Sequence, residues 1–419
     1  MRLPTPNIIY FVLLVALGVV SCKKGNIPDS PAVTKTLKLP AGSNAVIAAG
    51  NQFAFKFFNT VLQQDPALTN KLVSPLSIYT ALSMVYNGAA GSTRDSIAKA
   101  LQLNGISIDD LNALNKALIE QLPTEDSKVA MNIANSIWYK QGGPQPIPSF
   151  LSTIQDNYSA QVQSLDFGNP SAVNTINSWV AQKTMNKIPK VIESITAQEL
   201  MFLINTIYFN GSWMKAFKPS QTRNRDFDIP TGGYANVPFM SGEMGVRANQ
   251  APSFTIVELP YGGGKSYDMY LLLPSNRQQS IIDFAASFDV NKLTDAISQM
   301  DSFKIQINLP KWEYSYSIDD MKPHLTRLGM GMAFEDADLS NMYPPVGGQY
   351  YISRAIHKTN IKVSEQGTEA AAATVISIGL TSASPSPVIT FDHPFFYILR
   401  EKQAGAILFI GLVTDPSKS

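Results

Sequence analysis

One segment near the C-terminus is compatible with two structural settings, and it restricts the fold more than any other feature. Residues 365–386 read EQGTEAAAATVISIGLTSASPS, and from Gly367 onward they contain no Lys or Arg and one charged residue, Glu369. In an extended strand, alternate side chains point to opposite faces. One face would carry only small or branched side chains: Thr368, Ala370, Ala372, Thr374, Ile376, Ile378 and Leu380. A segment that suits both an exposed loop and the interior of a sheet predicts a conformational switch.

The composition is that of a globular protein without an obvious polyanionic partner. The 419 residues are enough for one large domain or for two. Hydrophobic residues make up 45% and charged residues 16%, and the formal net charge is +1. We find no basic stripe, so nucleic-acid binding is not expected. The 3 histidines are far apart in the sequence and not in a metal-binding spacing, so neither a metal nor another cofactor is expected.

The N-terminus has the pattern of an export signal. Met1-Arg2 precedes an apolar run from Ile8 to Val20, which has the length of a signal-peptide core and is short for a membrane span. The run ends in Val-Val-Ser21-Cys22, which resembles the bacterial lipoprotein signal with Cys22 as the lipidated residue. The alternative is that Cys22 is a buried thiol in an ordinary signal peptide. Because Cys22 is the only cysteine, no disulfide can form within one chain.

These observations predict three segments: a signal peptide over 1–21, a lipidated polar tether over 22–43 and a folded domain over 44–419. The expected location is the bacterial cell envelope. The protein would be exported and lipid-anchored to a membrane, facing either the periplasm or the cell exterior.

Helical patterns dominate the first half of the chain and strand patterns the second. Ala45–Gln63 has apolar side chains at helical spacing, and Ser74-Pro75 has the residue types of a helix N-cap and first helical position. Further helices are expected at 93–101, 108–122 and 173–187, and strands at 134–139, 203–209, 255–259, 267–273, 304–309 and 406–413. Helices followed by strands indicate an α+β domain.

A series of short motifs extends from Ala45 to Pro416. They include Ser74-Pro-Leu-Ser77, Gly91-Ser-Thr-Arg94, Leu203-Ile-Asn205-Thr-Ile-Tyr-Phe209, Val257-Glu-Leu-Pro-Tyr261, Leu309-Pro310-Lys311, Glu365-Gln-Gly367-Thr368-Glu369-Ala370 and Phe391-Asp-His-Pro394-Phe395. Together and in this order they resemble the serpin family. The resemblance implies an α+β fold with three β-sheets, eight or nine helices and an exposed reactive-centre loop. It also implies a monomer that traps target proteases as the cut loop inserts into the central sheet.

The resemblance also assigns roles to individual residues. They are the hinge residues Glu365, Gly367, Thr368, Ala370, Ala372 and Thr374, the shutter residues Ser74, Ser77, Asn205 and His357, and the breach residues Trp213 and Lys311. Lys311 and Glu365 match a salt bridge of the family. Without the resemblance, Ser74 would be a helix cap, His357 a satisfied core histidine and Trp213 a core aromatic residue.

The loop sequence indicates an inhibitor and limits its targets. A bulky or charged inward side chain would slow the start of insertion, and the inward face opens with the small residues Thr368, Ala370, Ala372 and Thr374. Counting from Gly367 by the family's usual loop length puts the scissile bond at Thr381-Ser382, with Leu380-Thr381 and Ala383-Ser384 as alternatives. These small or aliphatic residues favour elastase-like or subtilisin-like serine proteases, or papain-like cysteine proteases, over trypsin-like enzymes.

Two other functions stay open at this stage. A flexible Ala/Ser linker, or a non-inhibitory serpin acting as a binding or chaperone-like protein, would fit the same loop. Ser96-Ile-Ala-Lys99 fits the Ser-x-x-Lys of penicillin-binding enzymes, although no Ser-Asp-Asn follows, so a serine hydrolase centred on Ser96 is the remote alternative. The primary expectation is that the chain is not an enzyme. The region after Leu101 is not basic, so no glycosaminoglycan site is expected there.

Overall fold

A computed structural model describes residues 32–345, 350–368 and 386–418, and the helices and strands of this part form an α+β fold, as predicted. The α-helices are α1 Ser43–Gln64, α2 Pro75–Gly88, α3 Gly91–Ala100, α4 Ile108–Gln121, α5 Pro148–Tyr158, α6 Ser171–Lys183, α7 Ile281–Ala286, α8 Val290–Ser298 and α9 Lys322–Leu325. The strands are β1 Lys71–Val73, β2 Val129–Lys140, β3 Gln161–Leu165, β4 Met201–Ser212, β5 Arg223–Asp228, β6 Tyr234–Gln250, β7 Phe254–Pro260, β8 Tyr267–Pro274, β9 Asp301–Pro310, β10 Trp312–Ile318, β11 His357–Ser364, β12 Gly367–Thr368, β13 Val388–Thr390, β14 Phe395–Glu401 and β15 Ile407–Val413.

Local sequence accounts for several element boundaries. The side chain of Ser74 accepts a hydrogen bond from the backbone N–H of Ser77, and Pro75 takes the first position of α2, as predicted. The predicted helix 173–187 is wrong at its end, because α6 stops at Lys183 and Met185 and Asn186 adopt left-handed backbone conformations.

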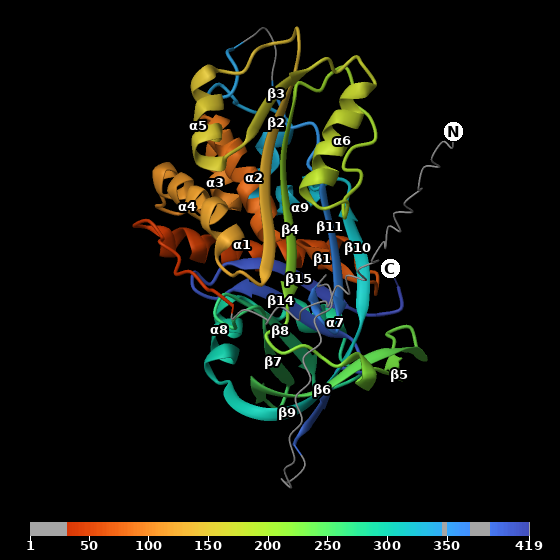
Figure 1. Ribbon diagram of the computed structural model, residues 1–419. Helices are drawn as coiled ribbons and strands as arrows, with labels where there is room; N and C mark the ends of the chain where they lie inside the picture. Colours follow the sequence, from red (N-terminus) through yellow and green to blue (C-terminus); the bar gives the residue numbers. More distant parts are fainter. Residues whose placement is uncertain (1–31, 346–349, 369–385, 419) are drawn as a thin grey trace, which may run out of the picture. The chain divides into compact units, whose positions relative to one another are not determined.

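The strands form two hydrogen-bonded sheets rather than the three implied by the resemblance. A nine-stranded sheet has the order β1-β15-β14-β8-β7-β6-β9-β13, with β5 also paired to β6. The 17-residue β6 joins two of the implied sheets, because it pairs with β5 and β9 over most of its length and with β7 at its end. The six-stranded sheet has the order β10-β11-β12-β4-β2-β3 and is called the central sheet below (Figure 1).

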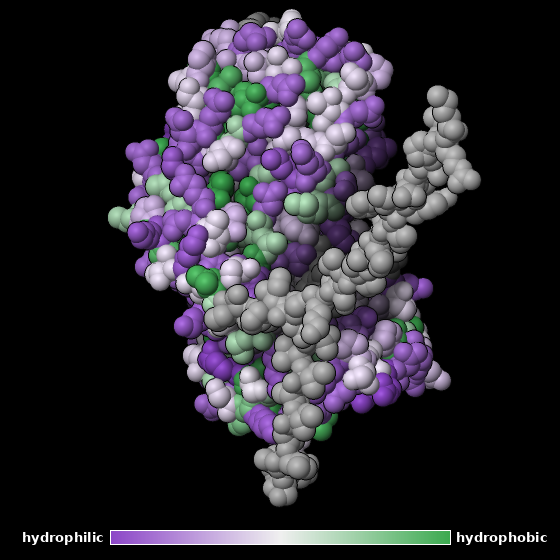
Figure 2. Space-filling view, in the orientation of Figure 1, coloured by the Kyte–Doolittle hydropathy of each residue, from purple (hydrophilic) through white to green (hydrophobic). Residues whose placement is uncertain are grey.

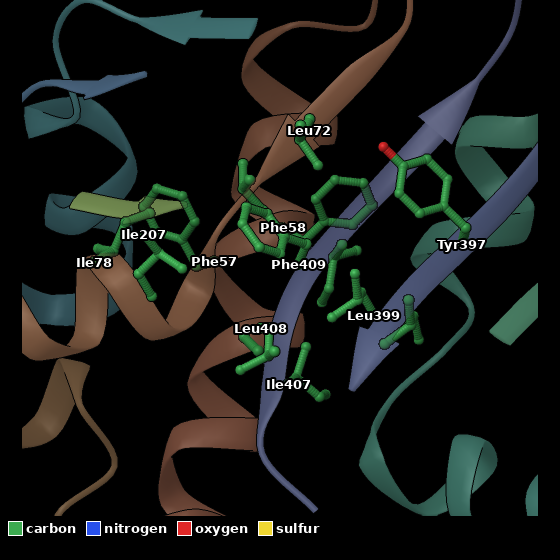
Figure 3. Close-up of a cluster of buried hydrophobic side chains, with 14 of the residues drawn as sticks. Phe57, Phe58, Leu72, Ile78, Ile207, Tyr397, Leu399, Ile407, Leu408 and Phe409 are labelled. Atoms are coloured by element: carbon green, nitrogen blue, oxygen red, sulfur yellow. The ribbon is translucent and has the colours of Figure 1, made fainter. Parts of the chain in front are cut away.

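Hydrophobic side chains fill both sides of the central sheet. The main core packs Phe57 and Phe58 of α1 and Ile78 of α2 against residues such as Ile207 of β4 and Leu408 of β15 (Figure 3). On the opposite face, α6 covers β2 and β4 through a second cluster that includes Trp138 and Trp179. One face of the central sheet is therefore packed on the main core, and α6 covers the part of the other face formed by β2 and β4.

The folded unit begins earlier than predicted. The compact unit starts at Ala32 rather than at residue 44. The backbone N–H of Lys35 donates to the carbonyl of Glu125 at 2.7 Å, and the N–H of Leu37 donates to the side chain of Gln403 at 3.1 Å. These hydrogen bonds attach residues 35–37 to the folded unit, although the polar composition of this segment indicated a tether.

The surface in view is mostly hydrophilic, with small separate hydrophobic areas (Figure 2). Among the described residues, none of the helices is both long and apolar enough to span a membrane. The predicted signal peptide over 1–21 and Cys22, the predicted lipidated residue, lie outside the described residues.

Candidate functional site: the opening in the central sheet

The predicted hinge begins as a strand in the middle of the central sheet. The two residues of β12 pair antiparallel with β11, where Thr368 lies opposite Val363. On the other side they pair antiparallel with β4, where Thr368 lies opposite Gly211. The first inward residue of the segment is thus already inside the sheet, between two long strands.

Gly367 fits this position because it has no side chain. Its φ of 143° is strained for other residues, and a Cβ atom would lie 2.0 Å from the carbonyl oxygen of Gly211. The contact is with backbone on a paired strand, so it cannot be relieved by a side-chain rotation. Glycine is therefore required for β12 to form.

Gly367→Ala is expected to displace β12 from the central sheet. The strain caused by the added Cβ atom should destabilise the paired state by on the order of 1.4 kcal/mol or more, which increases the unpaired population about tenfold. Hydrogen-exchange mass spectrometry should therefore show the backbone amides of residues 364–368 exchanging at least about tenfold faster. Gly245→Ala is the matched control, because a Cβ there meets no atom within 4 Å. Unchanged exchange in Gly367→Ala would contradict the geometry of β12.

Thr368 occupies an aromatic pocket. It is 3% exposed, and its hydroxyl forms a 2.6 Å hydrogen bond with the hydroxyl of Tyr261. The Tyr261 ring stacks on Trp213 at a centroid distance of 4.4 Å and meets Phe209 edge to face. Sequence reasoning named Tyr261 only as part of a motif, and nothing in the sequence shows that it faces Thr368. The pocket accepts a small hydroxyl side chain and leaves no route to solvent for a charged one.

Trp213 and Glu365 attach the hinge to the end of β4. The indole N–H of Trp213 donates to the carbonyl of Ser364 at 3.0 Å. The Glu365 carboxylate accepts a hydrogen bond from the hydroxyl of Thr222 at 2.8 Å and pairs with the ammonium of Lys311 at 3.0 Å. The structure thus brings the three predicted residues of the breach and its salt bridge together, and it adds Thr222.

This ion pair makes the attachment of the hinge pH-dependent. Burial alone would raise the pKa of Glu365, but hydrogen bonds from its own backbone, Lys311 and Thr222 outweigh burial and hold the pKa below its usual 4.5. The folded-state pKa is therefore lower than the unfolded-state value. The stability that the charged carboxylate contributes is complete above the unfolded pKa and is lost as the pH falls through the folded pKa.

Glu365→Gln is therefore expected to lower the melting temperature near pH 7 and to have little effect in acid. The difference in Tm from the wild type should shrink steadily as the pH is lowered below about 4.5. Glu313→Gln is the control, because its ion pair with Lys362 lies on the surface and should contribute little at any pH. A difference in Tm that is independent of pH would contradict the role of the Glu365 charge.

The four predicted shutter residues meet around the start of α2. The backbone N–H of Ser74 donates to Nε2 of His357 at 3.0 Å, and the Ser74 hydroxyl donates to the carbonyl of Leu408 at 2.9 Å. The Ser77 hydroxyl donates more weakly, at 3.4 Å, to the carbonyl of Asn205. Burial lowers the pKa of His357 to about 3, so its ring is neutral at physiological pH and Nε2 remains an acceptor.

A groove continues from β12 between β4 and β11. In the part of the chain that the structure describes, these two strands are joined only through β12. A small cavity beside Thr368 is lined by residues such as Phe209 and Ile361. Further along, a mainly apolar cavity of about 200 Å³ is lined by β4, α2 and residues 350–358. The edges of β4 and β11 therefore face each other across a space.

Two polar atoms in the larger cavity lack partners. Asn205 Oδ1 and Thr206 Oγ1 are buried and have no hydrogen-bond partner among the described residues. The Nδ2 group of Asn205 is held by Asn135 Oδ1 at 2.7 Å, so its orientation is fixed. A buried acceptor without a donor is costly, and a polar group entering the groove would satisfy it.

The remaining predicted site residues fall into two groups. Ala370, Ala372, Thr374, Leu380, Thr381, Ser382 and Ala383 lie outside the described residues. Ser96 lies in α3, and its hydroxyl donates to the carbonyl of Thr93 at 2.8 Å, an ordinary hydrogen bond within a helix. This geometry provides no base for Ser96, so it gives no support to a hydrolase.

Comparisons with known proteins agree with one another. A family model described as "Serpin (serine protease inhibitor)" matches residues 48–416. The chain is 32% identical over 387 residues to Serpin-Z2B of Triticum aestivum, covering 88% of this chain and 96% of that protein. It is 32% identical over 386 residues to the leukocyte elastase inhibitor of Bos taurus, covering 88% and 99%.

Solved structures give the same result. The native state of Tengpin, a thermophilic serpin, matches with a TM-score of 0.82 and 29% identity, covering 92% of this chain and 100% of that one. Human thyroxine-binding globulin matches with a TM-score of 0.80 and 25% identity, covering 89% and 99%. The matched family region includes every described residue of the site.

Proposed function

The chain belongs to the serpin family, and from this premise we propose that it is an irreversible suicide-substrate inhibitor of proteases. Serpins are protease inhibitors and not catalysts, so the chain is not an enzyme. The observation that carries the proposal is β12, which starts a strand between β11 and β4 at the end of a groove that continues between them.

The pairing of β12 defines the register that an inserting loop would follow. Each step forward from Thr368 corresponds to one step back along both β11 and β4. Continued insertion would therefore set Thr374 between Asn205 and His357. It would set Ile376 between Leu203 and Ala355, which both line the larger cavity. The same register keeps the charged Glu369 on the opposite face from Thr368.

In this register, the inserting side chains of Thr374 and Ile376 meet groove residues of matching polarity. The hydroxyl of Thr374 would arrive next to Asn205 Oδ1, the buried acceptor without a partner. Ile376 would enter the mainly apolar cavity, where burial of one such side chain contributes about 1.5–3 kcal/mol. The backbone of the loop would pair with β4 on one side and with β11 on the other. Both the side chains and the backbone of the loop therefore favour insertion, and cleavage would free the loop to insert.

The mechanism follows from the greater stability of the protein with its loop inserted. The nucleophile of the target protease attacks the carbonyl of the residue before the scissile bond, forms an acyl-enzyme and releases the chain on the far side. The segment that follows Thr368 then enters the groove with the protease still attached by its ester or thioester. Displacing the protease distorts its active site before water can cleave the acyl bond.

We propose elastase-like or subtilisin-like serine proteases as targets, with papain-like cysteine proteases as a further class. The scissile bond is proposed at Thr381-Ser382, with Leu380-Thr381 and Ala383-Ser384 as alternatives. Small and aliphatic residues at this point fit shallow apolar specificity pockets. The name of the bovine relative, leukocyte elastase inhibitor, supports the elastase-like class.

A second candidate is a non-inhibitory binding protein. One relative of similar fold is named thyroxine-binding globulin, so the fold also serves ligand carriage. Such a protein would be cut in the loop without forming a covalent complex. The small inward residues Thr368, Ala370 and Ala372 favour the inhibitor over this candidate, because they remove the steric and polar obstacles to insertion.

A denaturing gel tests the proposal. The domain from Ala32 onward is mixed with an elastase, a subtilisin, a papain-like enzyme and trypsin, and the released C-terminal peptide is weighed by mass spectrometry. We expect a detergent-stable band near the summed mass for at least one of the first three enzymes, and cleavage or no reaction with trypsin. Loop cleavage without a stable band for all four enzymes would favour the binding protein.

We further propose that the mature protein is lipid-anchored through Cys22 in a bacterial cell envelope, as an exported monomer. A Cys22→Ala precursor expressed in a bacterium is expected to lose its membrane attachment, because one or more acyl chains supply the anchoring free energy. Ser21→Ala is the control, since it keeps a small residue before the cysteine. Membrane fractionation of Cys22→Ala at the wild-type level would contradict the anchor.

A further inference from the structure

Four cations gather in the connection between β4 and β5 and in the first residues of β5. Between Trp213 and Arg225 the chain contains Lys215, Lys218, Arg223 and Arg225 and no Asp or Glu. The protein as a whole has a formal net charge of only +1. The positive charge is therefore concentrated locally, in a segment too short and interrupted to stand out in the composition. We call these four residues the basic surface.

The basic surface lies between the two points where the described chain meets the reactive loop. Before the loop, the backbone N–H of Phe217 donates to the carbonyl of Glu365 at 2.8 Å. After the loop, the Ser386 hydroxyl donates to the Glu243 carboxylate at 2.7 Å, and the Lys215 ammonium donates to the Glu243 carbonyl at 2.7 Å. The segment that carries the cations is thus bonded directly to Glu365 before the loop, and Glu243 links it to Ser386 after the loop.

Neighbouring carboxylates offset this surface only in part, and the Glu243 carboxylate attracts Lys215. On β5, Asp228 pairs with Arg277 at 2.5 Å and Asp226 accepts a hydrogen bond from Asn236. Glu243 pairs with another cation, Lys304, at 2.6 Å.

The four cations themselves are exposed to solvent. The guanidinium of Arg223 donates to the backbone carbonyls of Ser220 and Thr222 and is fixed there. In the described part of the chain, Lys218 and Arg225 form no ion pair. The surface therefore keeps a net positive charge, with one carboxylate, Asp226, beside Arg225.

We propose that the basic surface is a secondary docking site for a target protease that is acidic around its active-site cleft. This inference rests on the proposed inhibitory function and adds a selection by surface charge. A protease that holds the loop in its cleft comes close to both ends of the loop, and so to the segment that carries these cations. Opposite charges at this contact speed association and exclude proteases with basic rims.

The neighbouring side chains favour a protein over a polyanion as the partner. Met214 lies among the cations and is 49% exposed, and Ala216 and Pro219 are also exposed. An apolar side chain between cations suits the mixed contacts of a protein interface. A polyanion gains its affinity from phosphate or sulfate contacts with a continuous row of cations. The proposed partner is therefore the protease that binds and cleaves the loop.

The test measures binding without the covalent trap. Two subtilisin-like proteases of opposite surface charge, each with its catalytic serine replaced by alanine, are bound to the immobilised domain by surface plasmon resonance. The variant Lys218→Glu/Arg225→Glu is expected to associate with the acidic protease about tenfold more slowly at 50 mM salt. This reduction should shrink to less than about twofold at 0.5 M salt. Association of the basic protease should be unchanged or faster.

A matched variant controls for net charge. Lys56→Glu/Lys116→Glu makes the same change on the exposed faces of α1 and α4, and it should associate with both proteases at the wild-type rate. An unchanged rate for the acidic protease, an equal loss for both proteases, or no measurable binding to the wild type overturns the inference. Retention of the wild type on a sulfated polysaccharide at 0.15 M salt, lost in the variant without any change in protease association, also overturns it.

The proposed function and this inference can fail separately. The inactive acidic protease could associate in a charge-dependent way while the active enzyme forms no covalent complex. This result would support the docking site and contradict the proposed covalent inhibition. A covalent complex that forms at the same rate in the wild type and in Lys218→Glu/Arg225→Glu at 50 mM salt would keep the trap and overturn the docking site.

Discussion

Thr368→Arg is expected to turn the inhibitor into a substrate. Covalent complex with the target should fall by about tenfold or more, and the variant should be cut in the loop at close to the wild-type rate. The reason is that each inhibition event requires Thr368 to be inside the sheet, where its hydroxyl bonds to Tyr261 in a pocket without solvent access. An unpaired guanidinium there costs several kcal/mol, and each 1.4 kcal/mol changes the competition between insertion and release tenfold.

The control for this variant moves the same charge by one residue. Glu369→Arg places arginine on the other face of the extended segment, so it should keep most of the trapping. The stoichiometry of inhibition is measured by titrating a fixed amount of protease and resolving the products on a denaturing gel. Equal trapping by Thr368→Arg and Glu369→Arg would contradict insertion through the β12 position.

Cleavage of the loop is expected to raise the Tm of the free protein by about 20 °C. Burial of Ile376 and Ile378 contributes roughly 3–6 kcal/mol, and new backbone hydrogen bonds on both edges of the strand add about 0.5–1.5 kcal/mol each. The sum is on the order of 10 kcal/mol, and in a chain of this size each kcal/mol raises the Tm by about 2 °C. Differential scanning calorimetry before and after limited proteolysis measures the change.

Thr368→Arg also serves as the control for the melting experiment. After cleavage it should gain much less stability than the wild type, because the first inward position cannot enter the sheet. A wild-type Tm that does not change on cleavage would support the binding-protein alternative. A rise of the same size in the wild type and in Thr368→Arg would mean that the stabilisation has a source other than insertion at β12.

The fold could be predicted well from the sequence where local chemistry decides it. Ser74 and Pro75 define the start of α2, and alternating side chains define the buried face of β4, whereas β11 was not predicted as a strand. The family motifs extended this to the whole α+β architecture. The end of α6 was not predicted, because no Gly or Pro marks it; there Met185 and Asn186 adopt left-handed conformations, and the N–H of Asn186 donates back to the carbonyl of Ala181.

The site was predictable as a set of residues but not as a geometry. The sequence identified Gly367 as permissive, but only the structure shows the carbonyl of Gly211 that excludes a side chain there. Tyr261 and Thr222 lie more than 100 residues from their hinge partners, so their contacts follow from the tertiary fold. The basic surface was missed because its cations are spread over a strand connection and the start of β5, and only the tertiary fold places this segment beside the ends of the loop.

Hydrogen-exchange mass spectrometry of the cleaved protein tests the central claim most directly. The claim is that the cut loop becomes the strand between β4 and β11 in the register that β12 begins. The account predicts that residues 369–378 become strongly protected after cleavage, together with increased protection of β4 from Met201 to Phe209 and of β11. Fast exchange throughout residues 369–378 in the cleaved protein, with β4 and β11 unchanged, would contradict it.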